Sequence, residues 1–436
     1  MQHLLSFLLF LSVLSLFPTS VQGQALTPPP GKTIYIPEDL RDNDFSNPES
    51  QWSWSRMAYT DNIIVLWEKG FGNDLNNPPS LEGTDMSVDI DNLLSKLEYF
   101  YSFYKDELKF VLPGSKSEQY RMMVMLNYSL EGTAYGGTYD NEIGALWIAP
   151  NRVKDKTLNC IAHELGHSFQ SQIMADGTGA AWGGGGIFEM TSQWMLWNVN
   201  PNWVRDENYH WKGFIEHFHE RFLAGENIYH SPYVLEYWSM KHGKTVIGDL
   251  FRGGRRGEDP AMTYMRLFNL SLDSMSLEMY DCYSRLLTFD FPRVKSTHKQ
   301  FACELITPKM KRDEQGKKIF ISPEKESLPG TYGFNIFELP LSAKGKTVLF
   351  EGNPTDSNTG YRYGIVLVDK DKNATYLPSC SLAKGKLKYK TNAVTYKAFM
   401  VVVGCPKEKY PLIMFNPYER NEQPAEARYD YQVIVK

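Results

Sequence analysis

Residues 160–197 read CIAHELGHSFQSQIMADGTGAAWGGGGIFEMTSQWMLW, and this stretch decides how the rest of the chain is interpreted. It opens with the pattern HExxH, in which His163 and His167 flank Glu164. Residues four apart share one face of a helix, so a helix here would bring both imidazoles to one point. The apolar residues that would bury this helix are Ile161, Ala162, Leu165 and Phe169. A metal site needs such burial, whereas a surface helix with two unrelated histidines does not.

Two imidazoles beside a carboxylate match the ligands of Zn²⁺ and the base that acts next to it. Zinc accepts histidine nitrogen and carboxylate oxygen, and a catalytic site keeps one position open for water. The bound water becomes acidic, and a nearby carboxylate can take its proton and pass it to a leaving amine. The sequence therefore predicts a zinc site with His163 and His167 as ligands and Glu164 as general base.

Such a site needs a third ligand. The pattern HExxHxxGxxH is excluded, because Gln170 and Ile173 stand where it has Gly and His. The best candidate is Glu189, which follows the glycine run 183–186 and lies early in an apolar segment that predicts a second buried helix. An acidic residue in a first helical turn is otherwise explained by the helix dipole, but a carboxylate on so apolar a helix needs a partner. Weaker candidates in polar, turn-like sequence are Asp176, Asp206 and His210.

The beginning of the chain has the pattern of an export signal. Residues 4–17 are largely apolar, Pro18 ends this segment, and Val21-Gln22-Gly23 offers small-residue cleavage sites. Residues 1–23 are therefore predicted to be a signal peptide, although no Lys or Arg precedes the apolar segment. No later segment is long and apolar enough to span a bilayer. We expect a secreted or periplasmic protein without a membrane span.

Composition limits the remaining classes. A mature chain of about 410 residues suggests two or three domains. The net charge of −5 gives no reason to expect binding to nucleic acid or anionic membranes. Five cysteines do not make a dense disulfide framework. Cys160 is predicted to be a free thiol packed in an apolar run, and the pairs Cys282–Cys303 and Cys380–Cys405 remain open.

The segments before the HExxH helix predict a small sheet with one long helix. Residues 61–67, 122–126 and 144–149 are expected to be strands, and the spacing of apolar residues over 86–108 predicts an amphipathic helix. This order resembles the N-terminal lobe of zinc peptidases. There the strand before the active helix often presents a free edge to an extended peptide. Residues 144–149 are the candidate for that edge, or else an ordinary strand of the sheet.

The second half of the chain changes from helical to strand-like patterns. Residues 190–290 are expected to be mainly helical, and the charged segment 307–330 is expected to be a linker or domain edge. Beyond it, short segments of period two predict a β-sandwich. The expected strands are 334–339, 347–350, 363–368, 399–403 and 431–435. Some residues of this region could stabilise an oxyanion, although for each one taken singly a structural or surface role is favoured. They are His210, His217, His219, His230, His242, Tyr229 and Tyr233.

HELGHSFQ, the glycine-rich loop and FEMTSQW resemble the gluzincin type of zinc peptidase, in which a downstream Glu completes HExxH. More narrowly, the chain resembles an exported bacterial family of unknown function with an HExxH core. The supporting segments are IIVLWEKGFG (63–72), LEYFYSFYKDELKF (97–110), TYGFNIFELPL (331–341), GYRYGIVLV (360–368), FMVVVGCP (399–406) and YDYQVIVK (429–436). The resemblance implies zinc ligation by His163, His167 and Glu189, with Glu164 as general base. The usual small or acidic residue after the ligand Glu is not cleanly reproduced, since Ser192 and Gln193 stand there.

The expected fold class is α+β. Residues 24–310 would form a zincin-like metallopeptidase domain of a small sheet plus helices, and residues 311–436 an all-β sandwich accessory domain. The expected function is hydrolysis of peptide bonds in extracellular protein or glycoprotein, with a glycan contact through the C-terminal domain. One alternative is a glycan- or protein-binding secreted protein with a structural or inactive zinc site. Another is zinc-dependent hydrolysis of a non-peptide amide.

Overall fold

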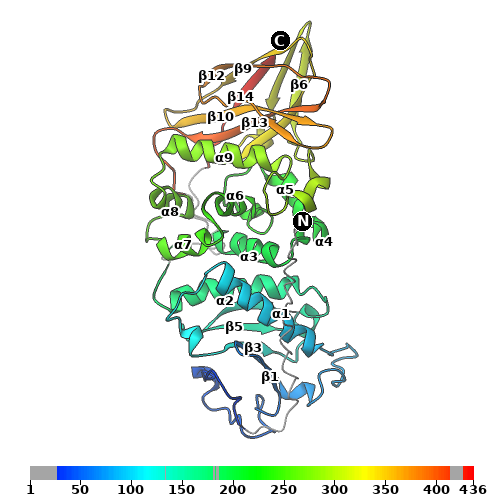
Figure 1. Ribbon diagram of the computed structural model, residues 1–436, viewed down its shortest axis with the longest axis vertical. Coiled ribbons are helices and arrows are strands. Elements are labelled where there is room, and N and C mark those ends of the chain that lie inside the picture. Colours follow the sequence, from blue (N-terminus) through cyan, green and yellow to red (C-terminus); the bar gives the residue numbers. More distant parts are fainter. Residues whose placement is uncertain (1–26, 133, 180–181, 183–185, 413–425) are drawn as a thin grey trace, which may run out of the picture.

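A computed structural model describes residues 27–132, 134–179, 182, 186–412 and 426–436. The predicted signal peptide, residues 1–23, and most of the glycine run lie outside the described residues. The molecule is a mixed α/β structure in which helices and sheets follow one another in layers along the longest axis (Figure 1). In the described part of the chain, no helix has the length and apolar character needed to cross a membrane.

The first layer is a five-stranded sheet in the order β1-β2-β3-β5-β4. Its strands are β1 (Met57–Tyr59), β2 (Ile63–Trp67), β3 (Met122–Leu126), β4 (Ala134–Tyr139) and β5 (Ile143–Ile148). β2, β3 and β5 run parallel, and the outer strands β1 and β4 are antiparallel to their neighbours. The helices α1 (Ile90–Ser102) and α2 (Asn159–Ala175) lie over one face of this sheet (Figure 1). A π-helical turn, Phe103–Glu107, continues α1.

A layer of helices follows, and its first member packs against α2 (Figure 1). The helices are α3 (Gly186–Val199), α4 (Trp203–Asp206), α5 (Asn208–His217), α6 (Tyr233–His242), α7 (Val246–Gly253), α8 (Pro260–Leu267), α9 (Leu272–Leu286) and α10 (Lys295–His298). Short 3₁₀ helices are Glu38–Leu40, Lys69–Phe71, Lys116–Glu118, Pro150–Arg152, Gly225–Asn227, Lys299–Phe301 and Lys325–Ser327. The predicted helical character of residues 190–290 is confirmed.

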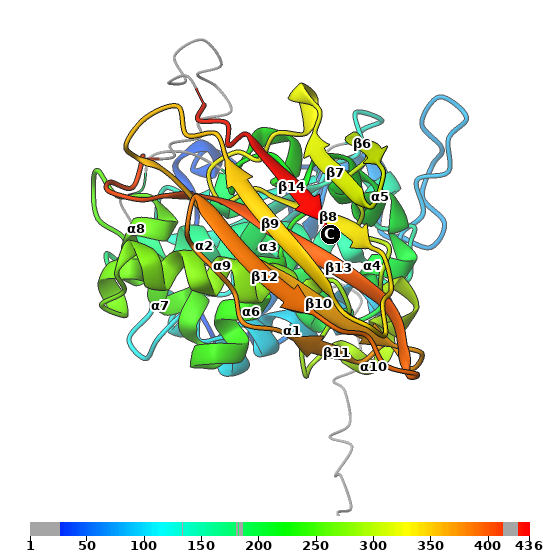
Figure 2. The same ribbon diagram turned by 90° about the horizontal axis from the view of Figure 1, so that it is seen from above.

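Two antiparallel sheets form the last layers, in the orders β11-β10-β13-β8 and β12-β9-β14-β7-β6 (Figure 2). Their strands are β6 (Met310–Gln315), β7 (Lys318–Pro323), β8 (Phe334–Leu339), β9 (Lys346–Gly352), β10 (Thr359–Asp369), β11 (Ala374–Tyr376), β12 (Lys384–Tyr389), β13 (Thr395–Pro406) and β14 (Tyr431–Val435). All five strands expected in this region are present.

The two faces of the four-stranded sheet belong to different cores. On β13, Phe399, Val401 and Val403 join the core of the helical layers. The alternate residues Met400 and Val402 join a second core, which also contains residues of the sheet β12-β9-β14-β7-β6. Successive side chains of a strand point to opposite faces, which explains the period-two pattern. The four-stranded sheet of the expected accessory domain thus shares a core with helices of the expected peptidase domain. The division into two domains between residues 310 and 311 stays a prediction.

The structure decides three points that the sequence left open. Residues 307–330 are not a linker, because β6 and β7 form a hairpin there. The strand at 144–149 has no free edge, because β5 lies between β3 and β4, and the free edge belongs to β4. All five cysteines lie in the described part and carry free thiols, so the pairs Cys282–Cys303 and Cys380–Cys405 do not form. Cys160 is free as predicted, and burial raises the pKa of its thiol to about 11.

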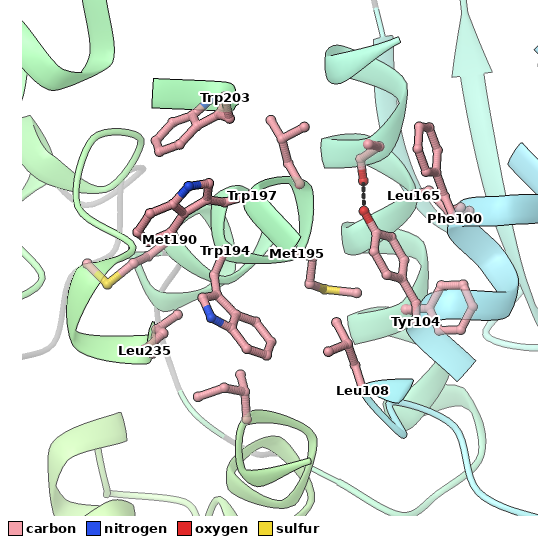
Figure 3. Packing of buried hydrophobic residues seen from close by; sticks show 14 of the residues in the cluster. Phe100, Tyr104, Leu108, Leu165, Met190, Trp194, Met195, Trp197, Trp203 and Leu235 are labelled. Atoms are coloured by element: carbon pink, nitrogen blue, oxygen red, sulfur yellow. Dashed lines mark hydrogen bonds between the residues drawn. The ribbon is translucent and has the colours of Figure 1, made fainter. Parts of the chain in front are cut away.

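Helix α3 is held in place by a buried ion pair on its far side. Glu236 of α6 accepts hydrogen bonds from Trp194 Nε1 (3.1 Å) and from the Arg293 guanidinium (2.8 Å to Nη2). Arg293 Nη1 also donates to the carbonyl oxygen of Trp197 (2.9 Å). Figure 3 shows Met195 of α3 between Trp194 and the side chains of Tyr104 and Leu108. The ion pair and this packing fix the position of α3 relative to α2.

We expect Glu236→Ala to destabilise the protein strongly. The Glu236 side chain is only 4% exposed, and its removal leaves the Trp194 indole without its acceptor and the Arg293 guanidinium without its carboxylate partner. Removing one partner of a buried ion pair costs about 3–5 kcal/mol. Urea denaturation should show a loss of this size. The exposed pair Arg205–Asp206 is the control, and Arg205→Ala should cost less than about 1 kcal/mol. Equal midpoints for the two variants would contradict a structural role for Glu236.

Candidate metal centre

Helix α2 presents His163 and His167 on the face that turns toward α3. The opposite faces of the helix are anchored in the core, with Ile161, Leu165 and Phe169 fully buried. The hydroxyl of Tyr104 donates a hydrogen bond to the Ala162 carbonyl oxygen (2.9 Å; Figure 3). A helix buried in this way holds its side chains in fixed positions. The HExxH pattern therefore lies on a rigid element, as expected from the sequence.

Three side chains converge between α2 and α3. The Nε2 atoms of His163 and His167 are 3.2 Å apart, and each lies 3.1 Å from Oε2 of Glu189. The three potential ligand atoms lie within 4.8 Å of one another, which is the arrangement of a group that could hold one metal ion. Burial raises the pKa of Glu189, but hydrogen bonds that His163 and His167 donate when Nε2 carries a proton, together with the charge of those rings, outweigh it, so the pKa lies well below its usual value. Glu189 is thus an ionised carboxylate at neutral pH.

A close helix contact makes this convergence possible. A Cβ atom on Gly166 would lie 2.8 Å from Oγ and 3.2 Å from Cα of Ser192. Only glycine at this position lets α2 and α3 approach so closely. Ser192 follows Glu189 by less than one helical turn, so the contact brings the carboxylate to the imidazoles. Ser192, which departs from the expected gluzincin pattern, therefore acts as a small residue at the helix crossing.

Two glutamines determine which nitrogen of each imidazole carries the proton. Gln193 Nε2 donates to the Tyr229 carbonyl oxygen (2.7 Å), so its Oε1 faces His163 Nδ1 (3.0 Å) and accepts from it. Gln170 Nε2 donates to the Phe188 carbonyl oxygen (3.0 Å). Its Oε1 accepts in the same way from His167 Nδ1 (3.2 Å). Both Nε2 atoms are then unprotonated in the neutral rings, and their lone pairs are available on the side of Glu189.

Glu164 lies beside the three converging groups and against the free edge of the first sheet. Its Oε2 accepts a hydrogen bond from the Gly136 amide of β4 (2.9 Å). A Cβ atom on Gly136 would lie 1.8 Å from the Glu164 carbonyl oxygen, so the close approach of β4 to α2 requires glycine. Burial is the main cause that raises the pKa of Glu164, against the lowering effect of the nearby histidines. A raised pKa suits a carboxylate that takes up and returns a proton.

A chain of hydrogen bonds leads from His163 away from the converging groups. Gln193 Nε2 also lies 3.2 Å from His210 Nε2, and His210 Nδ1 lies 2.7 Å from His230 Nδ1. Burial, with smaller contributions from His210 and His217, lowers the pKa of His230 to about 4. His230 is therefore neutral and can accept the hydrogen bond. His210, a weak ligand candidate in the sequence, supports Gln193 from behind.

The remaining candidates from the sequence lie apart from the three converging groups. Asp176 accepts hydrogen bonds from Lys116 and Gln172 at the end of α2, and Asp206 pairs with Arg205. His219 lies beside the Glu220 carboxylate, and His242 forms a hydrogen bond with the Tyr264 hydroxyl. The buried ring of Tyr233 packs edge-on against Trp197. His217 contributes to the lowered pKa of His230. Tyr229 is the candidate that does lie next to the three groups. Its ring stacks on that of His163, with 6.0 Å between the ring centroids, and the residue is 43% exposed.

Three residues that hold the side chains of the centre in place were not predicted from the sequence. Gln193 and Gln170 carry no signal of their own, although both stand inside the quoted stretch 160–197. Gln170 follows His167 by three positions and so shares its helix face, which could have indicated a contact. Gly136 belongs to a strand that was not expected, so nothing in the sequence linked it to Glu164.

No match was found among the curated proteins. The structure is similar to the ZmpB metallopeptidase from Clostridium perfringens, with a TM-score of 0.32 and 12% identity over 76% of this chain and 69% of that chain. It is also similar to the M60 catalytic domain from Clostridium perfringens ZmpC, solved in complex with the sialyl T antigen. That match has a TM-score of 0.30 and 12% identity over 83% of this chain and 68% of that chain.

At these TM-scores and identities the likeness carries no conclusion about activity, so any function assigned to the chain has to rest on its own residues. The family is established independently of these structures. The family model described as "Family of unknown function (DUF6055)" matches residues 27–436. This range leaves out only the beginning of the 436-residue chain, and the protein therefore belongs to that family.

Proposed function

We propose that this protein is a secreted zinc-dependent metallopeptidase that hydrolyses peptide bonds of extracellular protein or glycoprotein. One observation carries the proposal. Two imidazole Nε2 atoms and an ionised carboxylate converge within 4.8 Å, and a second carboxylate, that of Glu164, lies close enough for the charges of all three to act on it. A structural site needs no such base, whereas hydrolysis by a metal-activated water does.

The donor set fits zinc. His163, His167 and Glu189 offer two imidazole nitrogens and one carboxylate oxygen, the ligand types that catalytic zinc sites use with a fourth position for water. The tautomers imposed by Gln193 and Gln170 supply the lone pairs that a metal requires. When bound, Zn²⁺ would act as a Lewis acid on a carbonyl and make a water molecule acidic. Hard cations such as Mg²⁺ prefer oxygen ligands and fit this set less well.

Glu164 would perform the proton transfers. Its carboxylate takes a proton from the attacking water, and the carboxylic acid then returns the proton to the leaving nitrogen of the cleaved peptide. The hydrogen bond from the Gly136 amide holds one carboxylate oxygen in place, so the other is free to face the water. Burial, which raises the pKa, makes the protonated state accessible and helps the return of the proton.

The free edge of β4 would position the substrate. β4 pairs with β5 on one side only, and the Gly136 amide on its other side already reaches Glu164. An extended peptide that adds to a sheet edge forms backbone hydrogen bonds along it. A peptide on β4 would pass directly in front of Glu164. This assigns to β4 the role that the sequence suggested for residues 144–149.

Two further assignments complete the proposal. Residues 24–310 would form the zincin-like metallopeptidase domain, and residues 311–436 the β-sandwich accessory domain.

Tyr229 would stabilise the oxyanion that forms when water attacks the peptide carbonyl. Among the candidates from the sequence, it alone stacks on a proposed metal ligand and is exposed.

We expect Glu164→Gln to abolish measurable peptide hydrolysis while zinc stays bound. The amide keeps the shape of the side chain but cannot take a proton, and general acid–base catalysis contributes about 10²–10⁴-fold in rate. Proteomic cleavage-site profiling of the purified proteins would give the activity, and metal analysis would give the zinc content. The exposed Glu216→Gln is the matched control and should cleave like the wild type. Cleavage by Glu164→Gln at the wild-type rate would refute the mechanism.

We expect Gln193→Leu to weaken zinc binding by about 10–100-fold, since residues that orient a metal ligand contribute this much to affinity. Leucine removes the acceptor at His163 Nδ1 with little change in volume. Gln193→Glu keeps an acceptor there and should restore part of the affinity. Competition with a chromophoric chelator measures the dissociation constant. Unchanged affinity in Gln193→Leu would show that the glutamine does not orient the ligand.

A further inference from the structure

Five lysines line one hollow of the outer, five-stranded sheet. They are Lys344, Lys346, Lys388, Lys390 and Lys436, and the hollow, with a volume of about 490 Å³, is here called the lysine groove. The groove lies where β9 begins and where β12 and β14 end, strands that are neighbours in the sheet (Figure 2). No acidic residue lines it. Four of the five lysines are exposed, and Lys346 is partly buried.

Within the described part of the chain, no acidic side chain forms a salt bridge with a lysine of the groove. Lysines that form salt bridges there, such as Lys154 with Asp85 and Lys397 with Glu338, lie elsewhere. The basic character extends beyond the groove, because residues 311–436 contain 20 Lys and Arg against 14 Asp and Glu. The whole chain has a net charge of −5. A basic region on an acidic protein concentrates positive potential at one end of the molecule.

Protection of a sheet edge does not account for the groove. β12 is an edge strand, and lysines on such a strand prevent pairing with other chains. This reason suffices for Lys384 and Lys386, which alternate along β12. Edge protection does not explain Lys344 and Lys436, which lie outside β12 and also line the lysine groove. Gly345, with a φ of +91°, turns the chain between Lys344 and Lys346 at the rim.

The lining of the groove narrows the class of ligand. Tyr389, its one aromatic residue, is 4% exposed, so no ring is available for the stacking that single-stranded nucleic acids use. None of the exposed large apolar residues of the described chain lines the groove, so nothing there would insert into a membrane. What remains is a concave surface that offers ammonium groups at several points. A chain with regularly spaced anionic groups matches it.

We propose that the lysine groove binds an anionic polysaccharide that carries carboxylate or sulfate groups. The groove is shallow and open to solvent, with a volume of about 490 Å³, so a few sugar units of a longer chain could lie along it. Binding there would keep the protein on an extracellular matrix. The proposal does not depend on the metal centre, because the groove belongs to the outer sheet and shares no residue with it.

The test measures binding to the full chain by isothermal titration calorimetry. The probes are a chondroitin sulfate hexasaccharide for sulfate and a hexagalacturonate for carboxylate, and neutral dextran is the reference. We expect one or both anionic probes to bind, with an affinity that falls as the salt concentration rises, and dextran not to bind. The triple variant Lys344→Gln, Lys388→Gln, Lys390→Gln should bind at least about tenfold more weakly, with a smaller salt dependence.

The control removes the same charge elsewhere. Lys109, Lys156 and Lys325 are exposed and lie outside the groove, so their combined replacement by Gln should leave binding unchanged. Equal losses in the two triple variants would overturn the proposal. So would failure of both anionic probes to bind, or binding only to phosphatidylserine vesicles or single-stranded DNA. Glu164→Gln should bind the probes like the wild type, which separates this result from any failure of the proposed peptidase.

Discussion

The close crossing of α2 and α3 is the contact on which the proposed site depends. At this crossing Gly166 faces Ser192, and a side chain on the glycine would collide with the serine. The crossing places the carboxylate of Glu189 at equal distances of 3.1 Å from two imidazole nitrogens that come from one helical turn. A bulkier pair of residues would separate the helices and with them the three groups. Local helix geometry supplies two of the groups, and only tertiary packing supplies the third.

The surroundings of the crossing keep its polar groups in fixed positions. On the far side of α3, the buried pair of Glu236 and Arg293 binds two of its tryptophans. Between the helices, Gln170 donates to Phe188 and Gln193 donates to Tyr229, so each amide is tied to backbone on another element. Buried polar groups are costly unless every donor and acceptor is used. Here the glutamines satisfy this requirement and also fix the tautomers of the two histidines.

The sequence revealed what depends on local periodicity and failed where distant segments meet. Spacing within one helix was enough to place His163 and His167 together, and buried strands such as β3 were recognised from continuous apolar runs. β4 was missed because AYGGTY is rich in glycine, yet its Gly136 contacts Glu164. The β6–β7 hairpin was mistaken for a linker, since β6 exposes most of its charged residues to solvent. Glu189 was found because a carboxylate on an apolar helix stands out, whereas a neutral amide such as that of Gln193 does not.

The central claim is that one zinc ion binds at the crossing of α2 and α3. Anomalous diffraction at the zinc absorption edge, on crystals of protein purified without added chelator, tests it most directly. The account predicts a single strong peak about 2.0–2.2 Å from Nε2 of His163, Nε2 of His167 and a carboxylate oxygen of Glu189, with a water as the fourth ligand. A peak bound by other residues, or a peak with no contact to Glu189, would contradict it.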